Sequence, residues 1–430
     1  MALLQAYAWH THYFYLQNNF GYISMLLDSM KEKLKLYLLF PFLILTIALF
    51  IHSREYTFDF SIRLSDYLYT SWLFNYDFGF MKRGLIGQIL HHIQIPPTYK
   101  NIRLISIFLF LFLFYFIYLA TLRVLNTLTL DKKYKYTLLF CFMLLPFTTT
   151  QLILEISRFD QIAQLLVIIF LFIITQCKKT IIPFIYLTFS IVLLTLIHEA
   201  ALIIFSPLMI SLFYLNYKNK KQTYALSLLT IICIILISIY GTATSNQIHA
   251  LIQNYKNYRY FSEYAVRTTS LSIKENILLN LHALIQSKTY IAILIAIVVI
   301  IPFLNFIYQS FNFKKYYFFM IVTASPLLLS VIAFDYFRWI SLFLFNLTIL
   351  CFYLILTRIA DLNLLQNNLI KYKKYIVISA LIGITLGPFG ITELFPHFAK
   401  INQGALSDIN TATISKETLD KLNWSIHSNQ

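Results

Sequence analysis

Residues 180–216 read TIIPFIYLTFSIVLLTLIHEAALIIFSPLMISLFYLN, an apolar run whose only charged or imidazole side chains are His198 and Glu199. A helix needs about 20 apolar residues to cross a bilayer, so this run is too long for one span. The simplest arrangement is two antiparallel helices that meet in a tight turn at His198 and Glu199. This stretch predicts a helical protein that crosses the membrane several times.

The composition of the whole chain agrees with this prediction. Hydrophobic residues make up 59% of the 430 residues and charged residues 12%, and the mean hydropathy is +0.70. Soluble domains carry about 25% charged residues. The short alternating segments of a β-barrel are missing, so we expect an all-α, polytopic transmembrane bundle. The net charge of +16 is explained by basic cytoplasmic loops, and nucleic acid is not expected as a partner.

Hydropathy predicts about eleven membrane spans. The predicted spans are 36–53, 104–124, 136–153, 160–176, 180–197, 200–216, 223–243, 289–310, 316–333, 339–357 and 375–391. Compact Lys and Arg clusters occupy every second connection, which places the N-terminus in the cytoplasm and the C-terminus outside.

This topology divides the chain into three parts. We expect a cytoplasmic N-terminal segment (1–35), a single transmembrane domain (36–391) and an external C-terminal tail (392–430). The two long external loops, 54–103 and 244–288, carry apolar residues at helical spacing, which predicts short interfacial helices. The N-terminal segment lacks the pattern of a cleavable signal.

Four small polar clusters lie at the predicted external ends of apolar helices. They are Asp77 with Lys82 and Arg83; Glu155 with Arg158 and Asp160; His198 with Glu199; and Asp335 with Arg338. Ionisable groups at such depths normally face a cavity or each other. Structural explanations stay open, because pairing within one helix, snorkelling or contact with lipid headgroups would also account for several of these residues.

The residue types in these clusters suit an anionic substrate. Arginine forks bind phosphate oxygens through paired hydrogen bonds, and a desolvated carboxylate or an imidazole can act as a general base. Glycines close to Lys82 and Arg83 permit a close approach of backbone amides to an anion. The sequence contains no nucleotide-binding motif, and the four cysteines lack metal-ligand spacing, so neither a metal nor a cofactor is expected.

The order of the segments FGFMKRGLIG, SRFD, IHEAALIIFSPL and DYFRWI resembles that of bacterial oligosaccharide repeat-unit polymerases of the O-antigen (Wzy) type. These belong to the wider set of lipid-linked, GT-C-like glycosyltransferases. The resemblance covers residues 75–340. It implies a multi-pass protein of the bacterial inner membrane that works in surface polysaccharide synthesis.

The resemblance also implies a reaction. A glycan on undecaprenyl pyrophosphate would be transferred, at the periplasmic face, to another lipid-linked repeat unit. The implied roles are Glu199 or His198 as the base, Asp77 as an acceptor or orienting group, and Lys82, Arg83, Arg158, Asp160, Asp335 and Arg338 as ligands of the phosphate or glycan. The implied partners are lipid-linked oligosaccharides, membrane lipids and other polysaccharide-assembly proteins.

Other functions fit the same polar clusters. One is a flippase or transporter of a lipid-linked glycan, although the inverted repeats and broken helices typical of transporters are not clear in the sequence. Another is a transferase that adds a single sugar from a polyprenyl phosphate, or an acyltransferase acting on glycans. A nonenzymatic assembly factor would use the charges only as structural pairs.

Overall fold

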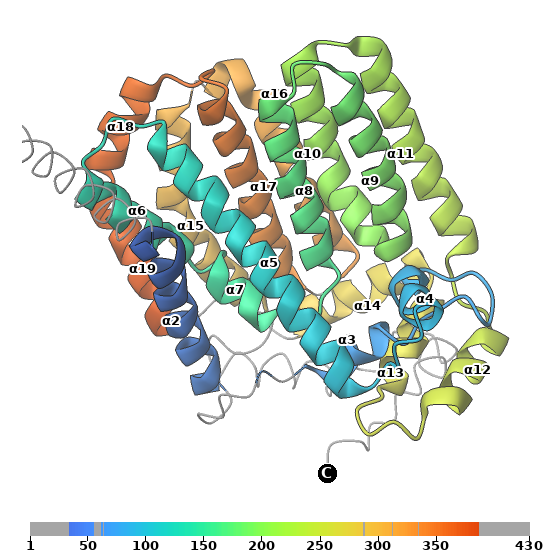
Figure 1. Cartoon of the computed structure of the whole chain (residues 1–430). Helices are drawn as coiled ribbons and strands as arrows, with labels where there is room; N and C mark the ends of the chain where they lie inside the picture. The colour runs from blue at the N-terminus through green and yellow to red at the C-terminus, as the bar shows by residue number, and fades with distance from the viewer. Residues whose placement is uncertain are drawn as a thin grey trace, which may run out of the picture. The chain divides into compact units, whose positions relative to one another are not determined.

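The computed structural model describes residues 34–55, 62, 64–286, 289–311, 313–333 and 335–386. These residues form helices and connecting segments, and no strand occurs among them (Figure 1). The all-helical class predicted from the sequence is therefore confirmed. The predicted external tail, 392–430, and nearly all of the predicted cytoplasmic segment, 1–35, lie outside the described residues.

The chain divides into two units, residues 1–47 and 48–430. The described part of the first unit is a π-helical turn, η1 (Lys35–Leu39), and the first half of α2 (Phe40–Glu55). All other helices belong to the second unit, which also contains all four predicted polar clusters.

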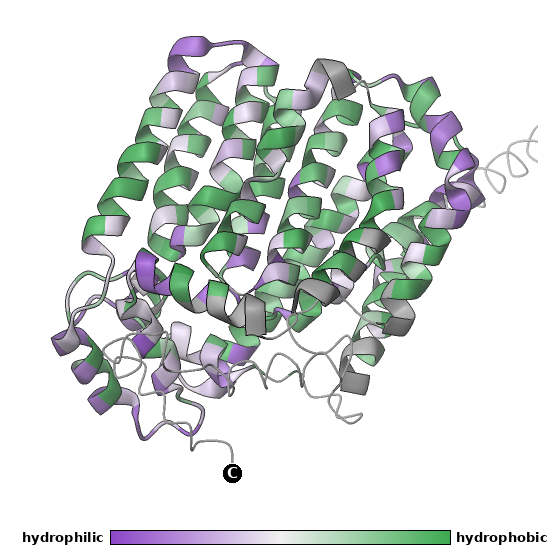
Figure 2. Cartoon of the chain, turned by 180° about the vertical axis from the view of Figure 1, so that it is seen from behind, coloured by the Kyte–Doolittle hydropathy of each residue, from purple (hydrophilic) through white to green (hydrophobic). Residues whose placement is uncertain are grey.

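Four helices of the second unit are long and apolar enough to cross a membrane: α5 (Tyr99–Asn126), α10 (Glu199–Tyr217), α11 (Lys220–Tyr240) and α17 (Tyr336–Leu356). Two shorter apolar helices of 17 residues, α8 (Asp160–Gln176) and α9 (Ile181–Ile197), lie near the lower limit for a span. Figure 2 shows the apolar residues along these helices. They indicate a membrane-embedded protein, while the count of eleven spans and the orientation stay predictions.

Two predicted spans are broken into pieces. The predicted span 136–153 consists of α6 (Lys132–Met143), a turn at residues 144–148 and α7 (Thr149–Leu154). Pro146 has no backbone N–H to continue a helix. The Thr148 hydroxyl lies within 2.8–2.9 Å of the carbonyl oxygens of Phe142, Met143 and Leu145, and so satisfies the end of α6. At about 18 Å, α6 alone is too short to cross a bilayer.

The predicted span 316–333 is interrupted in a similar way. It consists of α16 (Phe313–Thr323) and a 3₁₀ segment, η3 (Ser325–Val331), with Pro326 at the start of η3. The Ser325 hydroxyl donates to the carbonyl of Ile204 in α10, at 2.9 Å. The expectation of two continuous helical spans was therefore wrong at these places, and a proline lies three residues after the end of the first helix in each case.

The remaining helices are shorter or lie toward the C-terminus. They are α3 (Asp66–Ser71), α4 (Gly84–His92), α12 (Ser245–Tyr255), α13 (Glu263–Arg267), η2 (Thr268–Ser270), α14 (Ile273–Gln286), α15 (Thr289–Ser310), α18 (Leu362–Lys371) and α19 (Lys373–Leu386). Both apolar stripes in the predicted external loops form helices, α4 and α14.

The two predicted external loops pack against each other. The Thr70 hydroxyl accepts a hydrogen bond from the backbone N–H of Ser262 at 2.7 Å, and Lys82 N–H donates to the Gly241 carbonyl at 2.9 Å. A shared apolar cluster includes Phe74, Met81, Ala243, Ile248, Leu251 and Val266. These contacts fix the loop that carries Lys82 and Arg83.

The glycines in this loop serve close packing. A Cβ on Gly87 of α4 would lie 2.0 Å from the Phe74 carbonyl oxygen and 2.8 Å from that of Trp72. Gly79 has φ +106°, a conformation that side chains strongly disfavour, and faces the Gln247 side chain. The glycines therefore bring α4 against the preceding loop, which is a different use from the anion approach expected from the sequence.

We predict that Gly87→Ala destabilises the protein by about 1–3 kcal/mol, because backbone must move to admit the methyl group. Ile89→Ala on the same helix is the control, since Ile89 is 45% exposed and its loss should change stability by no more than about 0.5 kcal/mol. Thermal unfolding in detergent compares the two. Equal stability of Gly87→Ala and wild type would contradict this account of α4.

Candidate functional site

Three packed helices begin with a carboxylate. Asp160 and Glu199 lie in the first turns of α8 and α10, and Asp335 is the N-cap residue of α17. The three helices contact one another pairwise. Negative charge is favourable at a helix N-terminus, where backbone N–H groups are unpaired. The arrangement of α8, α10 and α17 thus gathers three acidic groups at one end of the bundle.

Arg338 joins two of these carboxylates. Its Nε and Nη2 atoms lie 2.6 and 2.5 Å from Asp160 Oδ2, and its Nη1 atom donates to Asp335 Oδ2 at 2.8 Å. Arg158 Nη1 donates to the same Asp335 oxygen at 3.1 Å. The Arg338 and Asp160 side chains are only 6% and 1% exposed, whereas Asp335 is 27% exposed. Arg338 and Asp160 therefore form an inner pair, and Asp335 reaches the surface.

Glu155 is a third carboxyl group near Arg158 and Arg338, besides Asp160 and Asp335. Burial raises the pKa of Glu155, against the lowering effect of Arg158 and Arg338. Its Oε1 atom is buried and has no hydrogen-bond partner. The short contacts of the two guanidinium groups go to Asp160 and Asp335 instead.

A second group of charges surrounds Glu199. Arg83 holds this carboxylate with both sides of its fork, from Nη2 to Oε1 at 2.7 Å and from Nε to Oε2 at 3.1 Å. Lys82 Nζ lies 3.8 Å from Oε1, and the Tyr67 hydroxyl lies 3.5 Å from Arg83 Nη1. Two cations thus share one carboxylate, and burial lowers the pKa of Lys82 while Glu199 raises it.

His198 lies between the two groups, in the turn from α9 to α10. Its Nδ1 atom accepts the backbone N–H of Ala200 at 3.1 Å, so the proton of the neutral imidazole is on Nε2. Burial and the nearby Arg83 lower the pKa of His198, Glu199 and Asp160 raise it, and the net effect is a pKa of about 4. Because Asp160 and Glu199 begin two helices that pack against each other, the two clusters lie at the same end of the bundle, with His198 in the turn that leads to Glu199.

We call this set of residues the polar site. It consists of Lys82, Arg83, Glu155, Arg158, Asp160, His198, Glu199, Asp335 and Arg338. Two of its connecting segments contain residues with positive φ, Arg83 at 66° and Ser157 at 79°. Such a conformation costs energy outside glycine and is found mostly where the surroundings enforce it. Trp72 Nε1 donates to the Ser157 carbonyl at 2.8 Å and holds this turn in place.

Asp77 is not brought into the polar site. Its Oδ2 atom lies 2.8 Å from His91 Nδ1 on α4, and both side chains are exposed at the surface. No ion pair between described residues joins Asp77 to Lys82 or to an arginine of the polar site. The remaining predicted site residues, Lys82, Arg83, Arg158, Asp160, His198, Glu199, Asp335 and Arg338, do converge.

Sequence reasoning gave no role to Glu155 or Tyr67. Glu155 stands beside Arg158 in the sequence, and that proximity was the only available signal. The contact of Tyr67 with Arg83 depends on the packing of loops 54–103 and 244–288, and no sequence pattern indicates it. Among the described residues, no group of three or more His, Cys, Asp or Glu side chains is arranged to hold a metal ion.

Comparison with known protein families, with curated proteins and with solved structures finds no match to this chain. The function must therefore be inferred from the polar site and from the helices around it. The resemblance to repeat-unit polymerases stays a prediction.

We predict that the two buried acids of the Arg338 cluster differ strongly in their effect on stability. Asp160→Asn leaves the buried Arg338 guanidinium without its main partner and should cost about 3–5 kcal/mol. Glu155→Gln imitates a neutral carboxyl and should cost less than about 1 kcal/mol. Unfolding in detergent measures both variants, and similar losses would show that Glu155 is charged in the folded protein.

We also predict a pH dependence that arises from His198. The pKa of this imidazole is lowered from 6.5 to about 4, so the unfolded chain binds its proton more readily than the folded protein does. The stabilising effect is complete above pH 6.5 and is lost as the pH falls toward 4. His198→Gln should lose less stability than wild type over this range in unfolding measurements. Parallel pH profiles would contradict the assignment.

Proposed function

We propose that the protein transfers or polymerises lipid-linked oligosaccharide repeat units, with the polar site binding the pyrophosphate of the substrate. The observation that carries this proposal is the surplus of positive charge. Lys82 and Arg83 both face the single carboxylate Glu199, so this outer part of the polar site holds more cations than carboxylates. An anion that replaces or joins Glu199 would complete the balance.

The position of these residues suits a substrate arriving from outside. The side chains of Lys82 and Arg83 are 15% and 17% exposed, and Glu199 is 25% exposed. The inner pair of Arg338 and Asp160 is shielded beneath them. We therefore assign substrate binding to Lys82, Arg83 and Arg158, and a structural role to the inner pair.

The helix ends favour an anion as well. The N-cap residue of α4 is Arg83, which makes no side-chain capping bond, so the first amides of α4 have no side-chain acceptor at the N-cap. Unpaired amides at a helix N-terminus attract phosphate groups. In α4 they stand beside the two surplus cations.

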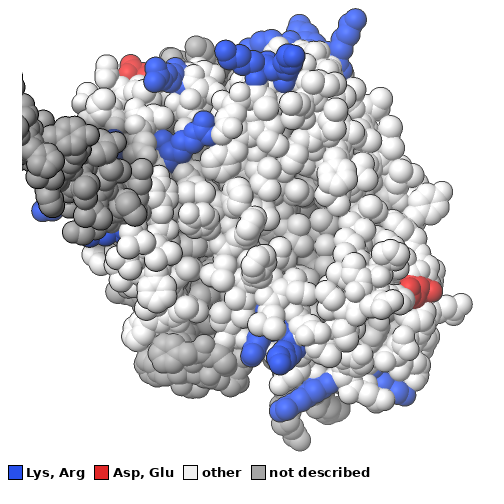
Figure 3. Space-filling view, in the orientation of Figure 1, with Lys and Arg blue, Asp and Glu red and all other residues white. Residues whose placement is uncertain are grey.

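The orientation of the core helices supports an external site. From the polar site, α8, α10 and α17 each run to a basic connection, which contains Lys178 and Lys179, Lys218 to Lys221, and Arg358 respectively. Figure 3 shows Lys and Arg side chains gathered at the far end of the bundle. The 19 residues of α10 separate the two ends by about 28 Å, close to the thickness of a bilayer core. Basic residues are typical of the cytoplasmic side, which supports a polar site at the periplasmic face.

The proposed reaction displaces the lipid pyrophosphate. The acceptor hydroxyl oxygen forms a bond to the anomeric carbon, the bond from that carbon to the pyrophosphate oxygen breaks, and the electron pair leaves with the lipid pyrophosphate. Lys82 and Arg83 stabilise the charge on this leaving group. The hydroxyl proton passes to a base.

Substrate binding would activate Glu199 as that base. Held by Arg83 and Lys82, its carboxylate has little affinity for a proton, because nearby cations favour the charged form. A pyrophosphate that takes over the two cations frees Glu199, and its proton affinity rises. His198 is less suited, since its Nδ1 lone pair already accepts the Ala200 N–H.

A transporter of lipid-linked glycans is the second candidate, and the broken helices favour it. The break between α6 and α7 leads to Glu155 and Arg158, and the break between α16 and η3 leads to Asp335. Discontinuous helices that end at a substrate site are typical of transporters. A single-sugar transferase would use the polar site in the same way as a polymerase.

We predict that Arg83→Lys and Glu199→Gln each lower the elongation of lipid-linked repeat units by about 30-fold or more. Loss of a bidentate contact to the leaving group, or of the base, should cost at least about 2 kcal/mol in the transition state. The assay is chain elongation by membrane vesicles supplied with a lipid-linked repeat unit. Lys256→Gln is the control, because Lys256 lies in the other external loop and contacts only Gln253 among the polar partners described.

The outcomes separate the candidates. Elongation at the wild-type rate by Arg83→Lys and Glu199→Gln would exclude the assigned roles. Movement of the lipid-linked unit across vesicle membranes without elongation, lost in Arg83→Lys but kept in Lys256→Gln, would identify a transporter.

A further inference from the structure

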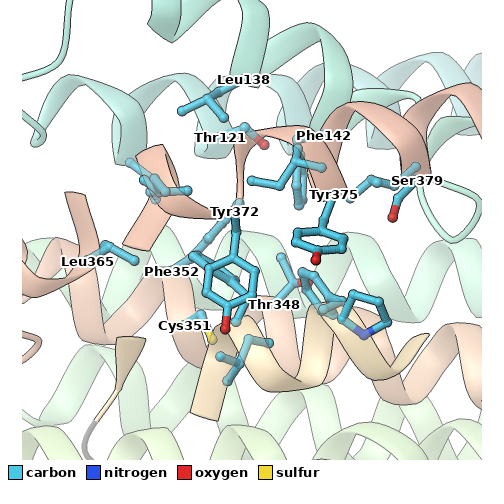
Figure 4. Close-up of a pocket in the computed structure, with 18 of the residues that line it drawn as sticks. Thr121, Leu138, Phe142, Thr348, Cys351, Phe352, Leu365, Tyr372, Tyr375 and Ser379 are labelled. Atoms are coloured by element: carbon cyan, nitrogen blue, oxygen red, sulfur yellow. The ribbon is translucent and has the colours of Figure 1, made fainter. Parts of the chain in front are cut away.

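An apolar cavity of about 140 Å³ lies in the second unit, away from the polar site. Helices α5, α6, α15, α17, α18 and α19 contribute to its wall (Figure 4). The lining includes Leu138, Phe142, Phe303, Phe352 and Leu365. A wall of this composition favours apolar molecules.

The wall contains few polar groups, and of these the buried Thr348 hydroxyl has no hydrogen-bond partner. The Thr121 hydroxyl donates to the Ile117 carbonyl of its own helix at 2.8 Å. The Tyr372 hydroxyl accepts from Asn305 Nδ2 at 2.9 Å. The chemistry of the wall therefore favours a hydrocarbon chain over a polar molecule.

The cavity reaches the surface beside α19. Tyr375 contributes to the lining and is 53% exposed. Lys371 and Lys373 flank Tyr372, another lining residue, and both lysines are exposed. The mouth of the cavity is therefore bordered by positive charge.

These lysines lie over aromatic rings. Lys371 Nζ lies 5.6 Å from the centre of the Tyr372 ring, and Lys373 Nζ lies 5.3 Å from that of Tyr134. The Tyr134 hydroxyl donates to the carbonyl of Leu369, a lining residue, at 2.7 Å. Among the described residues, neither lysine forms an ion pair with a carboxylate, so an external anion can approach both.

We propose that this cavity binds an anionic membrane phospholipid, with an acyl chain inside the cavity and the phosphate at Lys371 and Lys373. Basic pockets between helices on the cytoplasmic side suit such headgroups. This ligand is distinct from the lipid-linked substrate. Arg338 and Cys351, which lie at the polar site and at the cavity, are separated along α17 by about 20 Å.

The test uses the full chain purified in detergent and native mass spectrometry with added lipid. Phosphatidylglycerol should bind at least about 10-fold more tightly than phosphatidylcholine, which has no net charge. Lys371→Gln combined with Lys373→Gln should remove this preference, since each lysine near an anionic headgroup contributes roughly a factor of five. Lys220→Gln combined with Lys221→Gln is the matched control, with the same loss of charge at another basic connection, and should keep the preference.

A second variant tests the acyl chain. Cys351→Phe places a ring in the cavity and should reduce the binding of both lipids, while the protein melts at the same or a higher temperature in lipid-free detergent. Lys371 and Lys373 are exposed, so their substitution should not affect folding. The lysine variants therefore still test the proposal if Cys351→Phe fails to fold.

Several results would overturn the proposal. The first is equal affinity of the wild-type protein for the two lipids. The second is an equal loss of lipid preference in the Lys371/Lys373 and Lys220/Lys221 double variants. The third is binding of inorganic phosphate as tight as that of phosphatidylglycerol. A dimer in detergent that Cys351→Phe dissociates would assign the cavity to a second copy of the chain. None of these outcomes depends on polymerase or transport activity.

Discussion

The ion pair between Arg338 and Asp160 is the constraint on which the polar end of the molecule depends. Asp160 is placed at the N-terminus of α8 and Arg338 in the first turn of α17, and both side chains are almost completely buried. Burying either charge without its partner in an apolar bundle would cost several kcal/mol of stability. The N-termini of α8 and α17 must therefore lie side by side at the same end of the bundle. α10 packs against both, which brings Glu199 to the same end. One buried pair thus sets the level at which three helices begin.

The polar site combines a rigid inner part with a partly open outer part. The two charges of the inner pair balance each other through Asp160 Oδ2, while the buried Asp160 Oδ1 atom has no hydrogen-bond partner. The outer residues Lys82, Arg83 and Glu199 are imperfectly balanced, and a loop held by contacts to the other external loop carries the two cations. Charge that is left unbalanced at a partly exposed site indicates a ligand, whereas charge that is balanced and buried indicates structure. Exposure and charge balance thus distinguish the outer residues, to which we assign substrate binding in our proposal, from the inner pair.

Hydropathy predicted much of the bundle because apolar runs with clear charged ends have few other stable states in a membrane. The predicted spans 160–176, 180–197 and 200–216 agree with α8, α9 and α10 to within a residue or two. The breaks at Pro146 and Pro326 were missed, since both lie inside apolar runs and depend on hydrogen bonds from Thr148 and Ser325. The polar site was predicted as four clusters whose residues are far apart in the sequence. Their convergence, and the exclusion of Asp77, follow from tertiary packing that no local pattern contains.

The broken helices and the strained turns have a common physical cause. If α6 and α7 formed one continuous helix, its direction would fix the positions of Glu155 and Arg158. The turn that contains Pro146 changes the direction of the chain, and Arg158 then contacts Asp335 at the start of α17. The freed backbone groups at the break are satisfied by Thr148, and the turn at Ser157 is held by Trp72. Irregular backbone is tolerated at membrane depth only where protein or water covers it. The breaks therefore occur where several helix ends meet at a polar centre, whose outer residues Lys82, Arg83 and Glu199 stay partly exposed.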